Sequence, residues 1–245
     1  MIELKGVHKY YRNKGKGSGN GRIYALAGVN ATFQENKITS VMGNSGSGKT
    51  TMAHIISGFE KQDSGEVLYD GSYQRGRLTV RNVFQDPYIS LNPVKDVRWH
   101  LETAASLNNL ETEIFWENLE NTALRKENME SRVVGSMSGG ERQRLAFSMA
   151  ISQQPEYLIM DEPFSYLDSL NMFRILQLIK ELKDKITFIY FDHDMNRCTF
   201  LSDYIYIING GRIEEEGEPE RILSDPVSDF TESLLRSMPD IHKRI

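Results

Sequence analysis

The sequence predicts an α/β domain with a mostly parallel sheet. Short apolar runs typical of buried strands alternate along the chain with segments of helical spacing. The first such run, Lys37–Met42, leads into a glycine-rich turn and then a helical pattern from Gly48 towards Gly58. This order of strand, tight turn and helix is typical of α/β folds. The 245 residues suffice for one large domain, or for a core that carries a smaller subdomain.

The N-terminal part is expected to form two strands joined by a loop. Apolar and polar residues alternate over Ile2–Val7 and again over Ile23–Phe33, whereas Arg12–Arg22 is rich in glycine and lysine. The glycine-rich stretch fits a solvated basic connector and a role at phosphates or lipid head groups equally well. Further short strands are predicted at Glu66–Tyr69 and Val80–Phe84.

The second half of the chain continues the alternation of helices and strands. Leucine, glutamate and asparagine dominate Lys95–Arg132 at helical spacing, which indicates a helical insert. The elements expected after it are a helix from Gly140 to Ser152, a strand at Tyr157–Met160, a helix at Ser169–Lys183, a strand at Ile186–Phe191, a hairpin around Asn209-Gly210-Gly211 and two terminal helices.

Composition and charge exclude several classes of protein. No run approaches the roughly 18 apolar residues that a membrane-spanning helix needs, and the N-terminus lacks the pattern of a signal peptide. We therefore expect a cytosolic chain that reaches a membrane only by docking onto another protein. Cys198 is the only cysteine, which excludes an internal disulfide and a cysteine-held iron–sulfur cluster. The formal net charge of -5 argues against nucleic acid as a partner.

A phosphate-binding loop is predicted at the first strand–helix junction. The segment GNSGSGKT, Gly43–Thr50, fits the P-loop pattern, in which backbone N–H groups cradle phosphates at a helix N-terminus. We expect Lys49 to reach the β- and γ-phosphates of ATP and Thr50 to place its hydroxyl on Mg²⁺. A glycine-rich turn without a ligand is the alternative. The predicted ATP contacts here are Gly43, Asn44, Ser45, Gly46, Ser47, Gly48, Lys49, Thr50 and Thr51.

Two adjacent carboxylates end a later apolar strand. The segment YLIMDE, Tyr157–Glu162, delivers them at the carboxyl end, where open α/β sheets bind ligands. We assign Asp161 as a ligand of Mg²⁺ and Glu162 as the general base that activates the attacking water. A surface turn with two solvated acids is the alternative.

At this point the sequence resembles the ABC ATPase family. The segment SGGERQR, Ser138–Arg144, is similar to the family signature LSGGQ followed by QR, with Met137 and Glu141 in place of the usual leucine and glutamine. The resemblance implies an ABC-type nucleotide-binding domain that has an antiparallel β subdomain and a helical subdomain beside its mostly parallel core sheet. Other family elements occur in order: Gln85 matches the Q-loop, Tyr166-Leu167-Asp168 the D-loop, and His193 the switch histidine.

The resemblance also implies how these residues act. The domain is expected to work as a head-to-tail dimer in which the signature of one subunit closes over ATP on the P-loop of the other. Ser138, Gly139, Gly140 and Asp168 are then ATP contacts, His193 holds the γ-phosphate and water, Gln85 serves catalysis and Mg²⁺, and Tyr11, preferred over Tyr10, stacks on adenine.

Three of these residues also have ordinary structural interpretations. Taken singly, Gln85 could be a polar residue at a strand end, His193 a capping or packing histidine, and Tyr11 a half-buried core aromatic.

The same resemblance divides the chain into parts. Residues 1–85 and 155–218 are expected to form the core with the β subdomain, and residues 86–154 the helical subdomain with the signature. Residues 219–245 remain as a C-terminal helical tail. This division treats the whole chain as a single ABC ATPase domain.

Two phrases indicate which branch of the family is involved. VFQDPYISLNP, Val83–Pro93, is similar to the Q-loop region of the oligopeptide, dipeptide and nickel importer ATPases, and Phe84–Asn92 is our candidate for the mechanical link to membrane subunits. Its apolar members could equally pack against the helical subdomain. The tail Asp225–Pro239 resembles the subfamily's terminal phrase, although Ser228-Asp229-Phe230 stand where His-Pro-Tyr is usual.

The resemblance implies an import motor for peptides, nickel or a metal chelate at the cytoplasmic face of the cell membrane. Its expected partners are two permease subunits, a second ATPase chain that is identical or paralogous, and an extracytoplasmic solute-binding protein. The alternatives are an ATPase for export or lipid extraction, and a soluble ABC protein that moves no solute.

Overall fold

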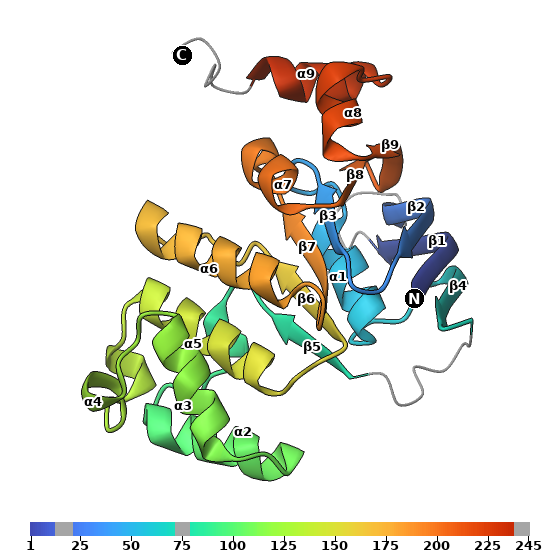
Figure 1. Ribbon diagram of the computed structural model, residues 1–245. Coiled ribbons are helices and arrows are strands. Elements are labelled where there is room, and N and C mark those ends of the chain that lie inside the picture. The colour runs from blue at the N-terminus through green and yellow to red at the C-terminus, as the bar shows by residue number, and fades with distance from the viewer. Residues whose placement is uncertain (13–21, 72–78, 238–245) are drawn as a thin grey trace, which may run out of the picture. The chain divides into compact units, whose positions relative to one another are not determined.

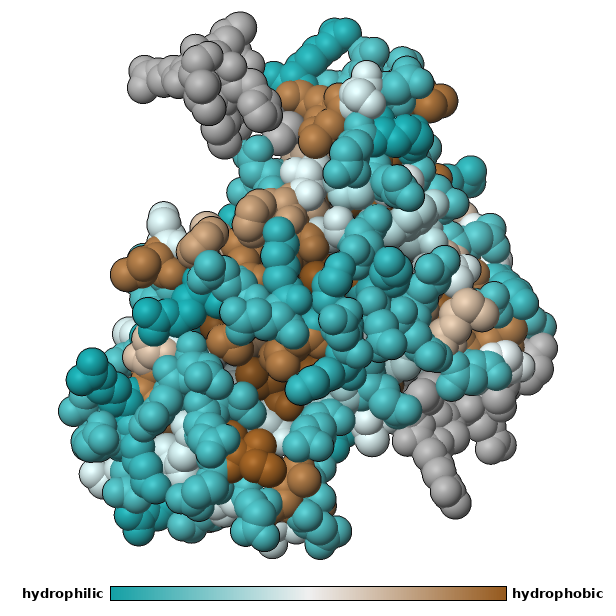
Figure 2. Space-filling model, in the orientation of Figure 1, coloured by the Kyte–Doolittle hydropathy of each residue, from teal (hydrophilic) through white to brown (hydrophobic). Residues whose placement is uncertain are grey.

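The computed structural model describes residues 1–12, 22–71 and 79–237, and Figure 1 shows its helices and strands. The chain folds into two compact units, one formed by Met1–Leu78 with Ile189–Ile245 and the other by Thr79–Phe188. Most of the predicted glycine-rich connector lies outside the described residues. Within the described ranges, no helix has the length and apolar character needed to cross a membrane. The face seen in Figure 2 is mostly hydrophilic, with smaller apolar groups between the polar side chains.

The first unit contains a three-stranded antiparallel sheet. Its strands are β1 (Ile2–Arg12), β2 (Arg22–Phe33) and β4 (Ser64–Tyr69), in the order β2-β1-β4. The alternation seen in the sequence places Ile2 and Leu4 of β1 in the core, each at most 2% exposed. Val7 is also buried, because the register of β1 against β2 shifts between Leu4 and Val7. The antiparallel β subdomain implied by the resemblance is confirmed, and β1 runs longer than predicted because its pairing with β2 continues to Arg12.

Parallel strands form the second sheet region of this unit. Thr39 of β3 (Ile38–Met42) pairs with Tyr204 of β8 (Tyr204–Asn209) in parallel, and β8 turns back into β9 (Arg212–Gly217). Gly210 and Gly211 both have positive φ, as the tight hairpin predicted from the sequence requires. The helices of the unit are α1 (Lys49–Ser57), α7 (Met195–Leu201), α8 (Pro219–Ser224) and α9 (Asp229–Ser237).

The second unit combines two parallel strands with the predicted helices. Strand β5 (Val80–Val83) pairs in parallel with β6 (Tyr157–Asp161). The carboxyl ends of these two strands therefore lie at the same edge of the sheet. The helical insert consists of α2 (Val97–Asn108), α3 (Thr112–Asn121) and α4 (Lys126–Met129), followed by α5 (Gly139–Ser152) and α6 (Ser169–Leu182). Two short 3₁₀ turns, η1 (Pro87–Ile89) and η2 (Val134–Ser136), connect these elements.

The helices of the second unit share one apolar core. Phe115 and Leu119 of α3 are completely buried and belong to the same cluster as Leu101 of α2 and Leu145 of α5. Full burial of such a side chain contributes about 1.5–3 kcal/mol, so this cluster fixes the helix that carries the signature motif. The α/β class predicted from the sequence is confirmed.

The buried carboxylate of Glu215 ties the tail to β9. Its side chain is 3% exposed, pairs with Arg221 at 2.7 Å, and accepts hydrogen bonds from the backbone N–H groups of Val227 and Ser228 at 3.0 and 3.1 Å. Burial alone would raise the pKa of Glu215, but these donors and the hydroxyl of Thr231 lower it to about 2. Glu215 therefore ties the residues that lead into α9 to strand β9. The last proline of the tail phrase, Pro239, lies outside the described residues.

Candidate functional site

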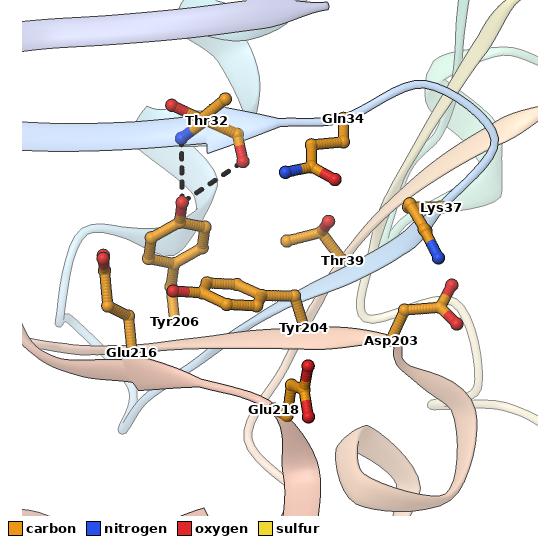
Figure 3. Close-up of a pocket in the computed structure, with 9 residues that line it drawn as sticks. All are labelled: Thr32, Gln34, Lys37, Thr39, Asp203, Tyr204, Tyr206, Glu216 and Glu218. Atoms are coloured by element: carbon orange, nitrogen blue, oxygen red, sulfur yellow. Dashed lines mark hydrogen bonds between the residues drawn. The ribbon is translucent and has the colours of Figure 1, made fainter.

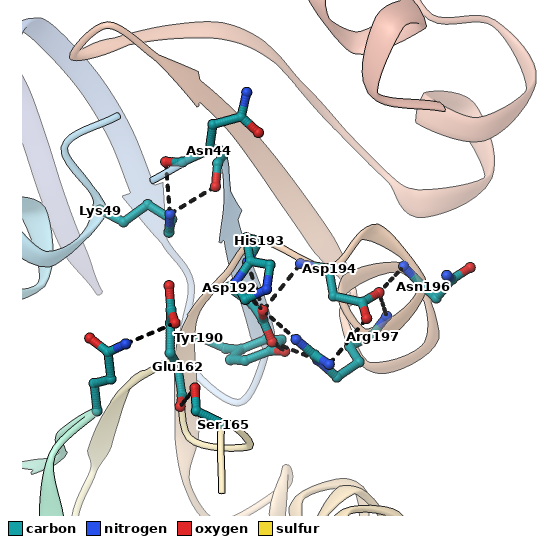
Figure 4. A network of polar contacts seen from close by, with 12 residues as sticks. Asn44, Lys49, Glu162, Ser165, Tyr190, Asp192, His193, Asp194, Asn196 and Arg197 are labelled. Atoms are coloured by element: carbon teal, nitrogen blue, oxygen red, sulfur yellow. Dashed lines mark hydrogen bonds and ion pairs between the residues drawn. The ribbon is translucent and has the colours of Figure 1, made fainter. Parts of the chain in front are cut away.

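The P-loop joins β3 to α1 and is closed around the side chain of Lys49. That side chain is 5% exposed, and its Nζ donates to the carbonyl oxygens of Gly43 at 2.7 Å and Asn44 at 3.0 Å. Figure 4 shows the ammonium group beside Asn44 at the start of the loop. The loop therefore wraps its own lysine, so a positive charge and the N-terminus of α1 lie together.

Two glycines of the loop have no room for a side chain. A Cβ on Gly43 would lie 2.2 Å from the carbonyl oxygen of Ile208, and one on Gly48 would lie 2.3 Å from that of Ala25. Gly48 also has a φ of 110°, which L side chains rarely adopt. In contrast, a Cβ on Gly46 would meet nothing within 4 Å, so the outer side of the loop is open.

His193 lies next to the P-loop in the first unit. It directly follows β7 (Thr187–Asp192), and the backbone N–H of Gly43 donates to the carbonyl oxygen of Asp192 at 3.3 Å. The side chain of His193 is 55% exposed. Asp192, which precedes the predicted switch histidine in the chain, therefore connects it to the P-loop by a backbone hydrogen bond.

Tyr11 is positioned beside the helix that follows the P-loop. Its hydroxyl donates to Glu60 at 2.7 Å and lies 3.5 Å from the hydroxyl of Thr51, while 42% of the residue is exposed. The neighbouring Tyr10 has its ring covered by the guanidinium of Arg22 at 4.2 Å. Tyr11 is the more exposed of the two residues, and Lys9 Nζ lies 5.7 Å from its ring centroid.

The second unit brings together the two polar residues that follow its parallel strands. Val83 pairs with Met160, so the chain leaves β5 and β6 at the same edge. There the side-chain amide of Gln85 donates to the carboxylate of Glu162 at 3.1 Å. Asp161, the last residue of β6, is 7% exposed. The predicted Q-loop glutamine and the predicted general base are therefore in contact.

The backbone at Glu162 is in an unusual conformation. Its φ is 44°, in the left-handed region that non-glycine residues rarely occupy. The Ser165 hydroxyl donates to the Glu162 carbonyl oxygen at 3.0 Å and holds the turn. Such strain costs on the order of 1–3 kcal/mol and clusters at functional sites.

The signature segment begins helix α5 with a capping box. The Ser138 hydroxyl accepts a hydrogen bond from the Glu141 N–H at 3.2 Å, and the Glu141 carboxylate accepts one from the Ser138 N–H at 2.7 Å. Arg132 donates to both carboxylate oxygens of Glu141, at 2.7 and 3.0 Å. Because the Ser138 oxygen acts as an acceptor here, its hydrogen remains to donate to a ligand.

The D-loop packs against the signature glycines within the same unit. A Cβ on Gly139 would lie 2.9 Å from the Tyr166 ring, and one on Gly140 would lie 2.8 Å from the Tyr166 carbonyl oxygen. Asp168 caps helix α6 by accepting from the Asn171 N–H at 2.9 Å. The side-chain amide of Asn171 also donates to Asp168, at 2.7 Å, and the two hydrogen bonds from Asn171 lower the pKa of Asp168.

The predicted metal ligands are chemically suited to Mg²⁺. They comprise one hydroxyl, one amide and one carboxylate, and Mg²⁺ prefers oxygen ligands while keeping several waters or substrate phosphates. Thr50 belongs to the first unit, and Gln85 and Asp161 belong to the second. Across residues 1–12, 22–71 and 79–237, no cluster of three or more His, Cys, Asp or Glu side chains forms a protein-only metal cage.

Sequence reasoning missed several residues that support these motifs. Arg142 of the signature helix places its guanidinium 4.4 Å from the Tyr88 ring centroid, so α5 contacts the segment that follows the Q-loop. Asp192 carries a buried ion pair with Arg197 beneath His193. The acidic residue was visible in FDHD, but no sequence signal connects it with an arginine five positions later.

A pocket of about 400 Å³ lies at the opposite end of β3 from the P-loop. Figure 3 shows Tyr204 and Tyr206 side by side in it, with the carboxylates of Glu216 and Glu218 near them. None of the predicted site residues lines this pocket.

Comparison with known proteins identifies consistent relatives. Residues 26–165 match the family described as ABC transporter. The chain is similar to the oligopeptide transport ATP-binding protein OppF of Streptococcus pyogenes serotype M1, with 32% identity over 98% of this chain and 82% of that protein. It is 35% identical to the spermidine/putrescine import ATP-binding protein PotA of Lawsonia intracellularis, over 94% of this chain and 62% of that protein. The dimeric ATP-binding cassette MJ0796, in a post-hydrolysis state bound to ADP and Pi, matches with a TM-score of 0.80 and 29% identity, over 89% of this chain and 99% of that chain.

Proposed function

The chain belongs to the ABC transporter family and is an ATPase, and we propose that it is the motor subunit of an importer that takes up peptides. The observation that carries the catalytic part of this proposal is the contact between Gln85 and Glu162. It holds a carboxylate beside Asp161 at the carboxyl end of a parallel strand, where a nucleophilic water has to be oriented for phosphoryl transfer.

In this proposal the first unit binds the nucleotide. The P-loop backbone and Lys49 hold the phosphates, and Tyr11 offers its exposed ring to adenine. Each hydrogen bond to a charged phosphate contributes about 1.5–3 kcal/mol, so a loop with several N–H groups holds the triphosphate firmly. His193, joined to the loop through Asp192, holds the γ-phosphate in line.

The second unit supplies the groups for hydrolysis. Glu162 accepts the proton of the attacking water, and Gln85 fixes the carboxylate in the orientation that this transfer needs. Thr50, Gln85 and Asp161 are the residues proposed to hold Mg²⁺. When bound, Mg²⁺ neutralises charge that develops on the phosphate oxygens.

We further propose that two ATPase chains assemble head to tail. The free hydrogen of the Ser138 hydroxyl, with the Gly139 and Gly140 N–H groups at the start of α5, can then contact a γ-phosphate on the partner, and Asp168 contributes from the D-loop. The dimeric structure of MJ0796 bound to ADP and Pi supports the assembly of two chains.

Peptide is the solute that two sequence phrases and one relative favour. Val83–Pro93 and Asp225–Pro239 resemble the peptide and nickel importer subfamily, and OppF is an oligopeptide transport protein. The identity with PotA makes a polyamine the second candidate. A nickel or metal-chelate solute rests on the subfamily resemblance alone.

Uptake requires further subunits. We propose that two membrane permeases hold the chain at the cytoplasmic face of the membrane, with a second ATPase and an extracytoplasmic solute-binding protein. The exposed Tyr88 and Ile89 of η1, in the segment Phe84–Asn92, are the proposed contact with the permeases. Arg142 touches Tyr88 and so links that contact to the signature helix.

Replacing Glu162 with glutamine tests the catalytic assignment. Glutamine keeps the shape of the side chain but accepts no proton, so turnover should fall on the order of 10²–10⁴-fold while ATP binding persists. Phosphate release and nucleotide binding are measured on the chain with its partner ATPase. Glu113→Gln on α3, whose side chain is 74% exposed, is the matched control and should keep wild-type turnover. Undiminished turnover in Glu162→Gln would refute the role given to Glu162.

Purification from native membranes tests the transport assignment. The chain is captured in mild detergent with ATP and vanadate, and the bound proteins are identified by mass spectrometry. Two multi-span permeases, an ATPase and a solute-binding protein support import, and the binding protein then allows peptide and polyamine binding to be compared. A set of soluble proteins without permeases contradicts the proposal and favours the non-transport alternative.

A further inference from the structure

A buried ionic cluster lies beneath His193. The side chain of Asp192 is 1% exposed. Arg197 donates two hydrogen bonds to its carboxylate, from Nε to Oδ2 at 2.8 Å and from Nη2 to Oδ1 at 2.7 Å. The Tyr190 hydroxyl also donates to Oδ2. The backbone N–H groups of His193 and Asp194 donate to Oδ1 at 2.6 and 3.1 Å. Figure 4 shows these groups converging on one carboxylate.

The cluster fixes a negative charge in one place. Burial alone would raise the pKa of Asp192, but the hydrogen bonds from Arg197 and Tyr190 more than offset it and leave the pKa below its ordinary value. Arg197 also reaches Asp194 at 3.1 Å, so its guanidinium lies between two carboxylates. A bidentate guanidinium restricts the carboxylate to one orientation.

This fixed carboxylate faces one particular atom of the histidine ring. Nδ1 of His193 lies 3.4 Å from Oδ1 of Asp192, within ion-pairing distance. A carboxylate on that side favours a proton on Nδ1 and leaves Nε2, on the far side of the ring, to act on a ligand. Carboxylates behind histidines orient the ring and set its tautomer in this way in catalytic and metal sites.

We propose that Asp192 is a positioning residue for His193: it holds the imidazole with Nδ1 inward and Nε2 toward the γ-phosphate, and Arg197 keeps Asp192 in place. The inference rests on the proposed function, because it assumes that His193 acts on ATP. A structural role is the competing explanation, since Asp192 also bonds the backbone at the start of α7.

A double-mutant cycle separates the two explanations. Asp192→Asn should lower kcat on the order of 10-fold, the lower end of what such supporting residues cost, with KM for ATP within about twofold. Because Asp192 acts through His193, the double variant with His193→Ala should be no slower than His193→Ala alone. Turnover is measured on the chain with its partner ATPase.

The control is Glu215→Gln, which removes the charge from another buried carboxylate that pairs with an arginine and two backbone N–H groups, in the tail. It should lower the melting temperature but not kcat. Additive losses in the double variant, or equal losses of kcat in Asp192→Asn and Glu215→Gln, would overturn the proposal. If His193→Ala itself keeps wild-type turnover, the proposed role of His193 fails first.

A measurement on the unmutated chain covers the case in which Asp192→Asn does not fold. Nitrogen-15 NMR of the histidine rings reports which nitrogen of His193 carries the proton. The proposal expects the neutral ring to be protonated at Nδ1. A neutral His193 protonated at Nε2 would overturn it.

Discussion

Ser138 and His193, the two residues proposed to meet the γ-phosphate from opposite subunits, are held in different ways. Ser138 is fixed by a capping box with Glu141, three residues away, and Arg132 pairs with that glutamate from a side chain that is 33% exposed. His193 is fixed by a carboxylate that is 1% exposed, with Arg197 as its counter-ion.

This comparison shows that the cost of losing a charged partner depends on how deeply the remaining partner is buried. At the exposed cap, water can replace a lost partner, and the backbone geometry of the helix start survives. At the buried cluster, removing one ion leaves the other without solvation, which costs more than the pair contributes. Equivalent charge pairs should therefore respond very differently to mutation.

The largest effect is expected for Arg197→Met. The variant leaves Asp192 buried without its counter-ion, so the free energy of unfolding should fall by about 3–5 kcal/mol. The matched change Arg132→Met should cost at most about 1 kcal/mol. Urea denaturation of the full chain measures both values, and similar costs for the two variants would break the comparison.

An intermediate effect is expected for Ser138→Ala. Loss of the cap oxygen leaves the N–H of Glu141 without its partner, so the free energy of unfolding should fall by about 1 kcal/mol. Ser138→Gly should cost only a few tenths, since glycine is tolerated as a cap. Thermal unfolding followed by circular dichroism distinguishes them, and a glycine variant less stable than the alanine variant would show that capping is not what holds this turn.

The smallest effect is expected for Glu141→Gln. Glutamine can still complete the capping box, so the loss at neutral pH should be about 0.5 kcal/mol, from the partly exposed pair with Arg132. Burial alone would raise the pKa of Glu141, but bonds from Ser138 and Arg132 lower it below 4.5.

The pH dependence of this variant follows from that lowered pKa. The charge of Glu141 stabilises the fold above pH 4.5, and the contribution disappears as the pH falls through the folded-state pKa. Wild type and Glu141→Gln should therefore converge in stability in acid. A difference that grows on acidification would contradict this sign.

Particular elements show where sequence reasoning succeeded and where it stopped. Helix α1 lies between Gly48 and Gly58, as the pattern predicted, because both glycines adopt the positive φ that ends a helix or opens a loop. Helix α7 was not predicted, since its seven residues are too few for a periodic pattern. The contact between Gln85 and Glu162 joins residues 77 positions apart and depends on the pairing of β5 with β6.

The sequence by itself determined the α/β class, the P-loop, the strand that carries Asp161 and the helix that follows the signature. Each of these depends on interactions within a few residues, which local spacing records. Only the tertiary structure decided which charges are buried, that Asp192 faces Nδ1 of His193, and that Arg142 reaches Tyr88. The burial of a charged side chain and the approach of distant side chains depend on how elements pack, and residue spacing along the chain does not record that packing.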